Sequence, residues 1–265
     1  MNRFPISLLI LAFGLTMMAC EKVIDVDLNE ADRQLVIEAQ LEEGEHVFEV
    51  YVTETGPYFS AGEQPIIRDA VVRLTDDQGL DELIPVNDDG FYTATIRAQA
   101  GRTYTLMVEI QGEVYQATSF LPSQVVLEDL LPEFQEARGP IEEGYLLYFY
   151  YNDPPNVPNF YRAVHRINGV AQLTGEDLQV VNDNINDGSY TRFPLFGQIF
   201  DPGDTVEVEL IHFDEASYDY FSSLGDIIDT GGGPNSGSAA PANPVTNWRG
   251  PADILGYFTA YSSSK

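Results

Sequence analysis

Short segments of alternating apolar and polar residues recur along the chain, and turn residues separate them at regular intervals. Residues 35–44 and 46–55 alternate in this way and are rich in β-branched and aromatic side chains. Residues 66–75, 103–110 and 114–122 continue the pattern. Alternation with a period of two residues directs one face of each strand toward a core. Closely spaced strands of this kind are typical of β-sandwiches. The chain is therefore predicted to be all-β.

Turn signals in the first half resemble those of a known kind of module. Asp69–Val72, within the predicted strand over residues 66–75, is followed by Gly90–Tyr92 and Gly101–Tyr104, and residues 87–90 (NDDG) form a strong turn signal. Their order resembles the transthyretin-like or carboxypeptidase-regulatory-like immunoglobulin modules of cell-surface proteins. The resemblance implies an immunoglobulin-like β-sandwich over residues 35–122.

The second half carries its own set of strand signals. Residues 144–151 (GYLLYFYY) are predicted to be a central strand, because aromatic residues occupy both of its faces. Residues 160–167, residues 205–213 and a closing strand over residues 254–261 follow. We therefore predict a second β-sandwich domain over residues 123–265, so that two immunoglobulin-like sandwiches stand in tandem.

One segment has the period of a helix. Residues 214–224 begin with Asp214, a good N-cap, and place apolar side chains at helical spacing, with Gly225 expected to end the helix. Residues 230–244 are rich in Gly, Pro and Ser and are predicted to form a surface loop.

The N-terminus predicts secretion and lipid attachment. Arg3 precedes an apolar run over residues 4–16, which is shorter than the roughly 20 residues that span a bilayer but suits a signal peptide. The run ends in Met17-Met18-Ala19-Cys20, and a small residue before the chain's only cysteine resembles a lipobox. The resemblance implies a signal peptide over residues 1–19 and a lipidated acidic tether over residues 20–34. Diacylglycerol and palmitate on Cys20 would then be the membrane anchor.

The net charge excludes several partners. The whole chain carries −29, and removing residues 1–19, with Arg3 as their one charged residue, leaves −30. A field of this sign repels nucleic acids and anionic lipids, so neither is expected to bind.

Further features resemble an uncharacterised (DUF-type) family of outer-membrane lipoproteins from Bacteroidota, frequently encoded beside TonB-dependent receptors. The residues that carry the resemblance run through most of the mature chain: the acids after Cys20, Asp153-Pro154, Asn159–Arg162, Pro202–Asp204, Tyr218, Tyr220, Asn243-Pro244 and Leu255–Phe258. The family has no established activity, so the resemblance implies a location and a partner rather than a reaction.

The sequence offers no catalytic constellation, and we expect no enzymatic activity, no cofactor and no metal site. His46, His165 and His212 stand apart without ligand spacing, and neither a Gly-x-Ser-x-Gly motif nor a phosphate-binding loop is present. The loop over residues 182–188 (NDNINDG) fails as an EF-hand, because Ile185 and Pro194 would occupy ligand positions. An irregular oxygen cage remains the alternative to a plain turn there.

Aromatic residues are the remaining candidates for contact with a partner. Most of the aromatics in residues 144–151 are expected to be core or domain-interface residues. Aromatics in predicted loops are better candidates, because Trp and Tyr are enriched at interface hot spots. The predicted contact residues are Trp248, Arg249, Tyr58 and Phe59.

Together these features predict a non-enzymatic cell-envelope lipoprotein that is an accessory or ligand-capturing partner of a TonB-dependent outer-membrane transporter. A stand-alone surface glycan-binding or adhesin module is the alternative, and an envelope structural protein is a third. Glu21, Asp25 and Asp27 resemble the acidic export signals of surface lipoproteins, which favours the cell surface. Lys22 and Val23-Ile24 interrupt these acids, so a position facing the periplasm stays open.

Replacing Cys20 with Ser removes the thiol that would carry the lipid. We expect the Cys20→Ser protein to move from the membrane fraction to the soluble fraction and to lose label from an alkyne palmitate. Thr16→Ser, which leaves Cys20 in place, is expected to stay membrane-bound and labelled. A labelled Cys20→Ser protein would contradict lipid attachment at this residue.

Overall fold

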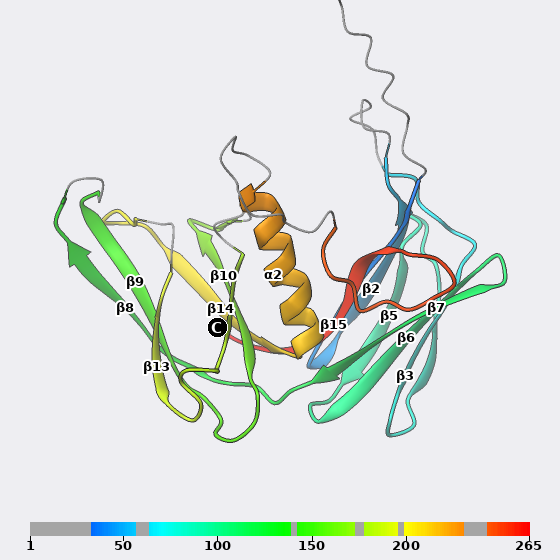
Figure 1. The fold of residues 1–265 in the computed structure, drawn as a ribbon, viewed down its shortest axis with the longest axis horizontal. Helices are drawn as coiled ribbons and strands as arrows, with labels where there is room; N and C mark the ends of the chain where they lie inside the picture. The colour runs from blue at the N-terminus through cyan, green and yellow to red at the C-terminus, as the bar shows by residue number, and fades with distance from the viewer. Residues whose placement is uncertain (1–32, 57–63, 139–141, 173–177, 196–198, 231–242) are drawn as a thin grey trace, which may run out of the picture. The chain divides into compact units, whose positions relative to one another are not determined.

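The structure is a computed structural model that describes residues 33–56, 64–138, 142–172, 178–195, 199–230 and 243–265. The strands of the first half are β1 (Leu35–Glu42), β2 (Gly44–Glu54), β3 (Val71–Asp76), β4 (Asp81–Ile84), β5 (Tyr92–Ala98), β6 (Arg102–Ile110) and β7 (Glu113–Leu121). The second half contains β8 (Leu127–Gln135), β9 (Gly144–Asn152), β10 (Phe160–Ile167), β11 (Val170–Ala171), β12 (Gln179–Asn182), β13 (Tyr190–Pro194), β14 (Val206–Phe213), helix α2 (Glu215–Thr230) and β15 (Leu255–Ser264). The prediction of an all-β, sandwich-like chain is confirmed (Figure 1).

Two sheets of the first half face each other across one core. One sheet has the order β4-β3-β6-β7, and the opposing sheet includes β15-β1-β2-β5. In β7 every second side chain from Tyr115 to Leu121 is buried, as the alternation in the sequence predicts. Ile37, Val50, Leu74 and Leu106 are fully buried in the shared core. Burial of each such side chain contributes about 1.5–3 kcal/mol, so this core is the main source of stability here.

A second core lies between β13-β9-β8 and the strands around β10 and β14. Phe149 and Tyr151 of β9 pack against Tyr161 of β10 and Leu210 of β14. Strand β9 is the central strand of its three-stranded sheet, as predicted.

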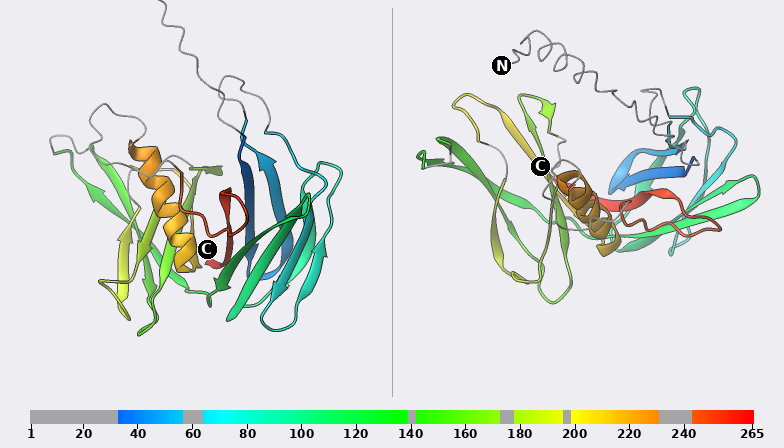
Figure 2. Two further views of the ribbon diagram at one scale, coloured as in Figure 1. Left: turned by 45° about the vertical axis from the view of Figure 1, so that its right-hand side comes forward. Right: turned by 45° about the horizontal axis from the view of Figure 1, so that its top comes forward.

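Strand β15 joins the two sets of strands. It pairs in parallel with β1 along Val36–Glu42 and antiparallel with β14 at its other end. One eight-stranded sheet therefore contains strands from both halves, in the order β11-β10-β14-β15-β1-β2-β5 with β12 paired to β10 (Figures 1 and 2). Residues 33–265 accordingly form one compact unit. The two predicted domains, divided at residue 122, therefore share one sheet, because β15 completes the sheet of the first half.

The close approach of β15 to β1 depends on Gly256. This glycine has φ of +93°, and a Cβ there would lie 2.1 Å from the carbonyl oxygen of Ile37. Only glycine adopts this backbone conformation without strain, and only glycine leaves room for the neighbouring strand.

Helix α2 is longer than predicted. It runs through Gly225 to Thr230 instead of ending near residue 224. An isolated glycine costs a helix only about 1 kcal/mol, and nothing lies within 4 Å of a Cβ at Gly225. Ile227 and Ile228 follow Leu224 at helical spacing, so the apolar stripe continues beyond the glycine.

The predicted N-cap of this helix, Asp214, is confirmed, and its side chain also binds strand β7. The Oδ1 atom of Asp214 accepts a hydrogen bond from the backbone N–H of Ser217 at 3.0 Å. Its Oδ2 atom accepts hydrogen bonds from the Ser119 hydroxyl at 2.8 Å and from the Phe120 N–H at 2.9 Å. Asp214 thus attaches the start of α2 to β7 in the first half of the chain.

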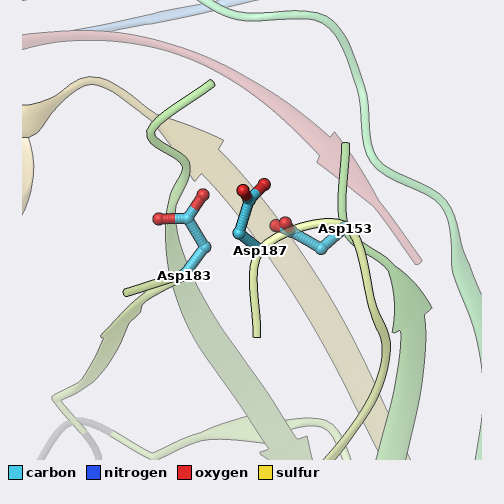
Figure 3. Close-up of side chains that lie close together, drawn as sticks. All are labelled: Asp153, Asp183 and Asp187. Carbon is cyan, nitrogen blue, oxygen red and sulfur yellow. The ribbon is translucent and has the colours of Figure 1, made fainter. Parts of the chain in front are cut away.

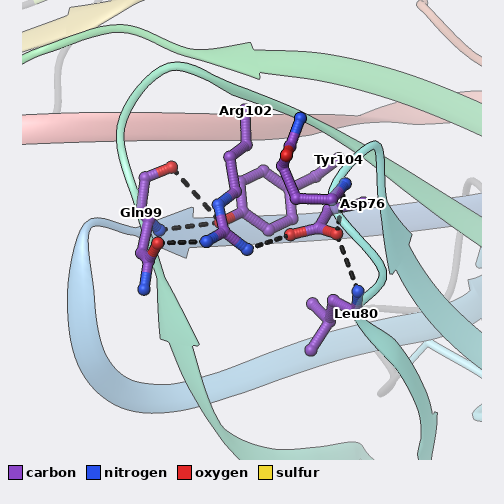
Figure 4. Close-up of polar contacts among 6 residues, drawn as sticks. Asp76, Leu80, Gln99, Arg102 and Tyr104 are labelled. Atoms are coloured by element: carbon purple, nitrogen blue, oxygen red, sulfur yellow. Dashed lines mark hydrogen bonds and ion pairs between the residues drawn. The ribbon is translucent and has the colours of Figure 1, made fainter.

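A buried polar network holds the turns at one end of the first sandwich (Figure 4). Arg102 Nη1 lies 2.7 Å from Asp76 Oδ2, and the Asp76 side chain is 1% exposed. Burial raises the pKa of Asp76, but the hydrogen bonds from Arg102, Leu80 and Gln78 outweigh burial and lower it overall. The hydroxyl oxygen of Tyr104 accepts a hydrogen bond from the Gln99 N–H at 2.7 Å. The turn between β5 and β6 is therefore fixed by the contacts of Arg102 with Asp76 and of Tyr104 with Gln99.

No helix among the described residues is both long enough and apolar enough to cross a membrane.

Gly256→Ala is expected to destabilise the protein more than Gly79→Ala does. Both glycines have positive φ, but a Cβ at Gly79 has nothing within 4 Å. The backbone strain alone costs about 1–2 kcal/mol, and the clash with Ile37 adds about 1–3 kcal/mol at Gly256. Urea denaturation of the two variants measures the difference, and equal losses would contradict a tight contact between β15 and β1.

Candidate functional site

The structure locates Trp248 and Arg249, whereas Cys20, Tyr58 and Phe59 lie outside the described residues. Trp248 is 3% exposed, and its Nε1–H donates a hydrogen bond to the Ile37 carbonyl at 3.0 Å. The segment before β15 folds back over the first core, so the Trp248 ring is buried although the residue lies in a loop. This corrects the expectation that Trp248 contacts a partner. Arg249 is exposed, and its backbone pairs with Gln116 of β7.

The histidines lie apart on different strands. His46 is exposed on β2, whereas His165 on β10 and His212 on β14 are buried. His212 Nδ1 lies 2.8 Å from the carbonyl oxygen of Ser123, and its ring packs 4.9 Å from that of Tyr161. Burial lowers the pKa of His212, so the ring is neutral near pH 7 and acts as a packing residue.

Three carboxylates come together at one end of the second core (Figure 3). Asp153 follows β9, and Asp183 and Asp187 belong to the loop after β12. Each offers an oxygen within 4.8 Å of the others, and Asp153 and Asp183 are buried. Three such oxygens are a partial ligand set for a divalent cation. The sequence could not reveal this group, because Asp153 lies far from the other two along the chain.

Hydrogen bonds already engage all three carboxylates. Asp153 accepts the Tyr161 hydroxyl at 2.5 Å on Oδ1 and the Gly188 N–H at 2.8 Å on Oδ2. Asp183 Oδ2 accepts the Asn159 N–H at 3.0 Å, and Asp187 Oδ1 accepts the Asn156 N–H at 2.7 Å. These bonds connect the loop after β9 to the loop after β12, so we assign the cluster a structural role.

The outer face of the sheet β13-β9-β8 is rich in partly exposed aromatic side chains. Cross-strand register and alternation place side chains of all three strands on this face, which we call the tyrosine face: Leu131, Tyr148, Tyr150, Tyr190 and Arg192, with Asp129 and Glu133 beside them. Tyr190 is 53% exposed and Leu131 is 47% exposed. Tyr148 and Tyr150 are half-buried.

Contacts among these side chains hold the rings in place. The Tyr150 and Tyr190 rings stack with centroids 5.7 Å apart, and the Arg192 guanidinium lies 3.6 Å from the centre of the Tyr148 ring. Arg192 also forms an ion pair with Glu133 at 2.6 Å. Partial burial, together with the negative charges of Asp129 and Glu128, raises the pKa of Tyr190, whose hydroxyl therefore remains a donor.

The sequence signal for this face was the alternation within residues 144–151. Leu147, Phe149 and Tyr151 are buried, as expected for core residues. Tyr148 and Tyr150 point to the opposite side of the sheet and are not core residues. The register with β8 and β13 places the two rings on the face away from the second core.

A family model described as "Domain of unknown function (DUF4249)" matches residues 21–265. The match confirms the expectation of an uncharacterised family. No curated protein and no solved structure matches the chain.

Tyr161→Phe is expected to destabilise the protein by about 1–3 kcal/mol, because it leaves a buried oxygen of Asp153 without its donor. Tyr190→Phe is the matched control: its hydroxyl is exposed and lies 3.5 Å from Asp129, so the expected loss is below about 0.5 kcal/mol. Urea denaturation measures both. Equal stability of the two variants would show that the cluster does not hold the loops.

Proposed function

The chain belongs to the DUF4249 family, and we propose that it is a non-enzymatic, lipid-anchored envelope protein that serves as an accessory or ligand-capturing partner of a TonB-dependent outer-membrane transporter. The observation that supports this proposal best is the tyrosine face. It offers partly exposed ring surface on a three-stranded sheet, on the side away from the second core.

The composition of the tyrosine face suits a protein interface. Tyr and Arg are enriched among residues that dominate binding energy, and such residues work best when a polar rim surrounds them. Tyr150 and Tyr190 supply stacked rings, and Leu131 supplies an exposed aliphatic side chain. Asp129 and Glu133 lie beside them as polar groups. Because Arg192 is already oriented by Glu133, little side-chain entropy is lost when a partner binds.

A binding role also agrees with the polar groups of the described residues. Both buried histidines sit within strands, and His212 is neutral and packed against Tyr161. The acidic cluster is engaged by backbone and side-chain donors. The Ser119 and Ser217 hydroxyls donate to the capping carboxylate of Asp214 and are buried, which favours a structural role for them over a catalytic one.

The location in the proposal rests on the sequence. Cys20 after an apolar run supports lipid attachment, and the acids at Glu21, Asp25 and Asp27 support export to the cell surface. The strongly negative charge supports a partner that is neither nucleic acid nor anionic lipid.

Glycan binding is a second candidate function, and the same face gives it a specific basis. Tyrosine rings can stack against the apolar faces of sugars, and Asp129, Glu133 and Arg192 could hydrogen-bond hydroxyl groups. A glycan-binding protein of this kind would act without a transporter.

The test is a pull-down from detergent-solubilised outer membranes with the lipidated protein as bait. We expect to recover a TonB-dependent receptor, identified by mass spectrometry. The triple variant Tyr148→Ser, Tyr150→Ser, Tyr190→Ser should lose at least about 90% of that receptor, since loss of interface anchors costs several kcal/mol.

A triple variant on the other half of the chain is the matched control. Val71, Leu83 and Phe120 are exposed apolar residues of the sheet β4-β3-β6-β7, and their replacement by Ser should leave recovery unchanged. Equal recovery with both triple variants would exclude the tyrosine face. Absence of a receptor with the unmodified protein, together with tyrosine-dependent signals on a glycan array, would favour the second candidate function.

A further inference from the structure

A cavity opens on the outer face of the strands β15, β1 and β2, away from the tyrosine face. Its volume is about 390 Å³, which lies within the usual range of small-molecule sites. The residues that line it come from these three strands: Glu38, Ala39, Gln40, Val47, Glu49, Tyr51 and Tyr257. Strands hold their side chains more rigidly than loops do, so the shape of the cavity is preformed.

Glu38 stands between two tyrosines in this cavity. The register pairs Glu38 with Tyr257 on β15 and with Tyr51 on β2. The aromatic row continues on both sides, because the Tyr51 ring lies 4.6 Å from that of Phe91 and the Tyr257 ring lies 4.4 Å from that of Tyr220. A carboxylate is therefore flanked by aromatic rings along one row of the sheet.

The tyrosine hydroxyls are fixed, but the carboxylate of Glu38 is not. The Tyr51 hydroxyl donates to Glu49 at 2.9 Å, and Gln40 bonds the Tyr257 hydroxyl. By contrast, no hydrogen bond or ion pair joins the side chain of Glu38 to any residue that the structure describes. Its side chain is half-buried, and this burial raises its pKa. A partly desolvated carboxylate without a partner gains when a cation pairs with it.

The charged residues that line the cavity are both acidic. Glu38 and Glu49 are its ionisable acids, and none of the described residues that line it is basic. Tyrosine rings attract cations through their π-faces. The neighbouring aromatic cluster already accommodates a cation, because the Arg162 guanidinium lies 4.3 Å from the centre of the Phe221 ring, which in turn packs 5.0 Å from Tyr257.

We infer that this cavity binds a small cationic ligand, an alkylammonium group that pairs with Glu38 and lies against the rings of Tyr51 and Tyr257. Carboxylate and aromatic walls together are the means by which proteins hold quaternary ammonium groups. This inference goes beyond the proposed function and does not depend on a transporter, because the cavity and its charges belong to the isolated chain.

The test compares choline with its uncharged carbon isostere dimethylbutanol, which has the same shape. Amide resonances of the mature chain are followed by NMR as each probe is titrated. Choline is expected to shift the resonances of Glu38, Tyr51 and Tyr257. Dimethylbutanol lacks the positive charge and therefore both the charge pair and the cation–π contact, so its affinity in the same titration is expected to be at least about tenfold lower.

Glu38→Gln is expected to weaken choline binding at least about tenfold, since it removes the charge while keeping the shape. Glu82→Gln is the matched control, because it removes the same charge from an exposed position on β4 in another sheet, and its choline affinity should equal that of the unmodified chain. Equal affinity of the Glu38→Gln and Glu82→Gln variants, equal shifts by both probes, or no shift with choline would each overturn the inference. None of these outcomes bears on the receptor pull-down, which uses the tyrosine face.

Discussion

The hydrogen bonds on the two sides of strand β15 are the interaction on which the arrangement of the described residues depends. On one side, residues Leu255–Tyr261 pair in parallel with β1, and on the other, Ser262–Ser264 pair with β14. A strand that leaves one partner and joins another along its own length converts two short sheets into one. Without it, β1 and β14 would each present an unpaired edge, which folded proteins avoid. The last residues of the chain are therefore needed before either half is complete.

Polar contacts reinforce this join at the start of α2. Asp214 binds Ser119 and Phe120 of β7 through Oδ2 and Ser217 of α2 through Oδ1. The Ser119 hydroxyl oxygen also accepts the Ala260 N–H at 2.8 Å. A half-buried carboxylate that accepts donors from two elements, β7 and α2, fixes their relative position more strictly than apolar packing does, because apolar contacts tolerate sliding. Asp214 thus sets the start of α2 against β7, and the Ser119 hydroxyl extends the link to β15.

Local patterns in the sequence predicted the strands well and their partners poorly. Alternation from Leu35 to Leu121 and the Asp214 cap each depend on neighbouring residues, so a single sequence reveals them. The parallel pairing of β15 with β1 joins strands that are far apart in the sequence, and no local sequence pattern predicts it. Trp248 was misplaced for the same reason, because its ring is buried by strands more than a hundred residues away. The three clustered aspartates and the row around Glu38 likewise exist only after the strands have paired.

The joined sheet also separates two surfaces that could otherwise be confused. The tyrosine face belongs to β13-β9-β8, which is a sheet of its own, whereas the cavity around Glu38 lies on β15, β1 and β2. No residue is shared, so substitutions on one surface should leave the other unchanged. Gly256 is different, because it directly precedes Tyr257 on the strand that both halves need. A change there would disturb the cavity and the fold together, whereas Glu38 and the exposed tyrosines can be altered one at a time. The proposed partner contact and the proposed ligand capture can therefore be tested separately by substitution.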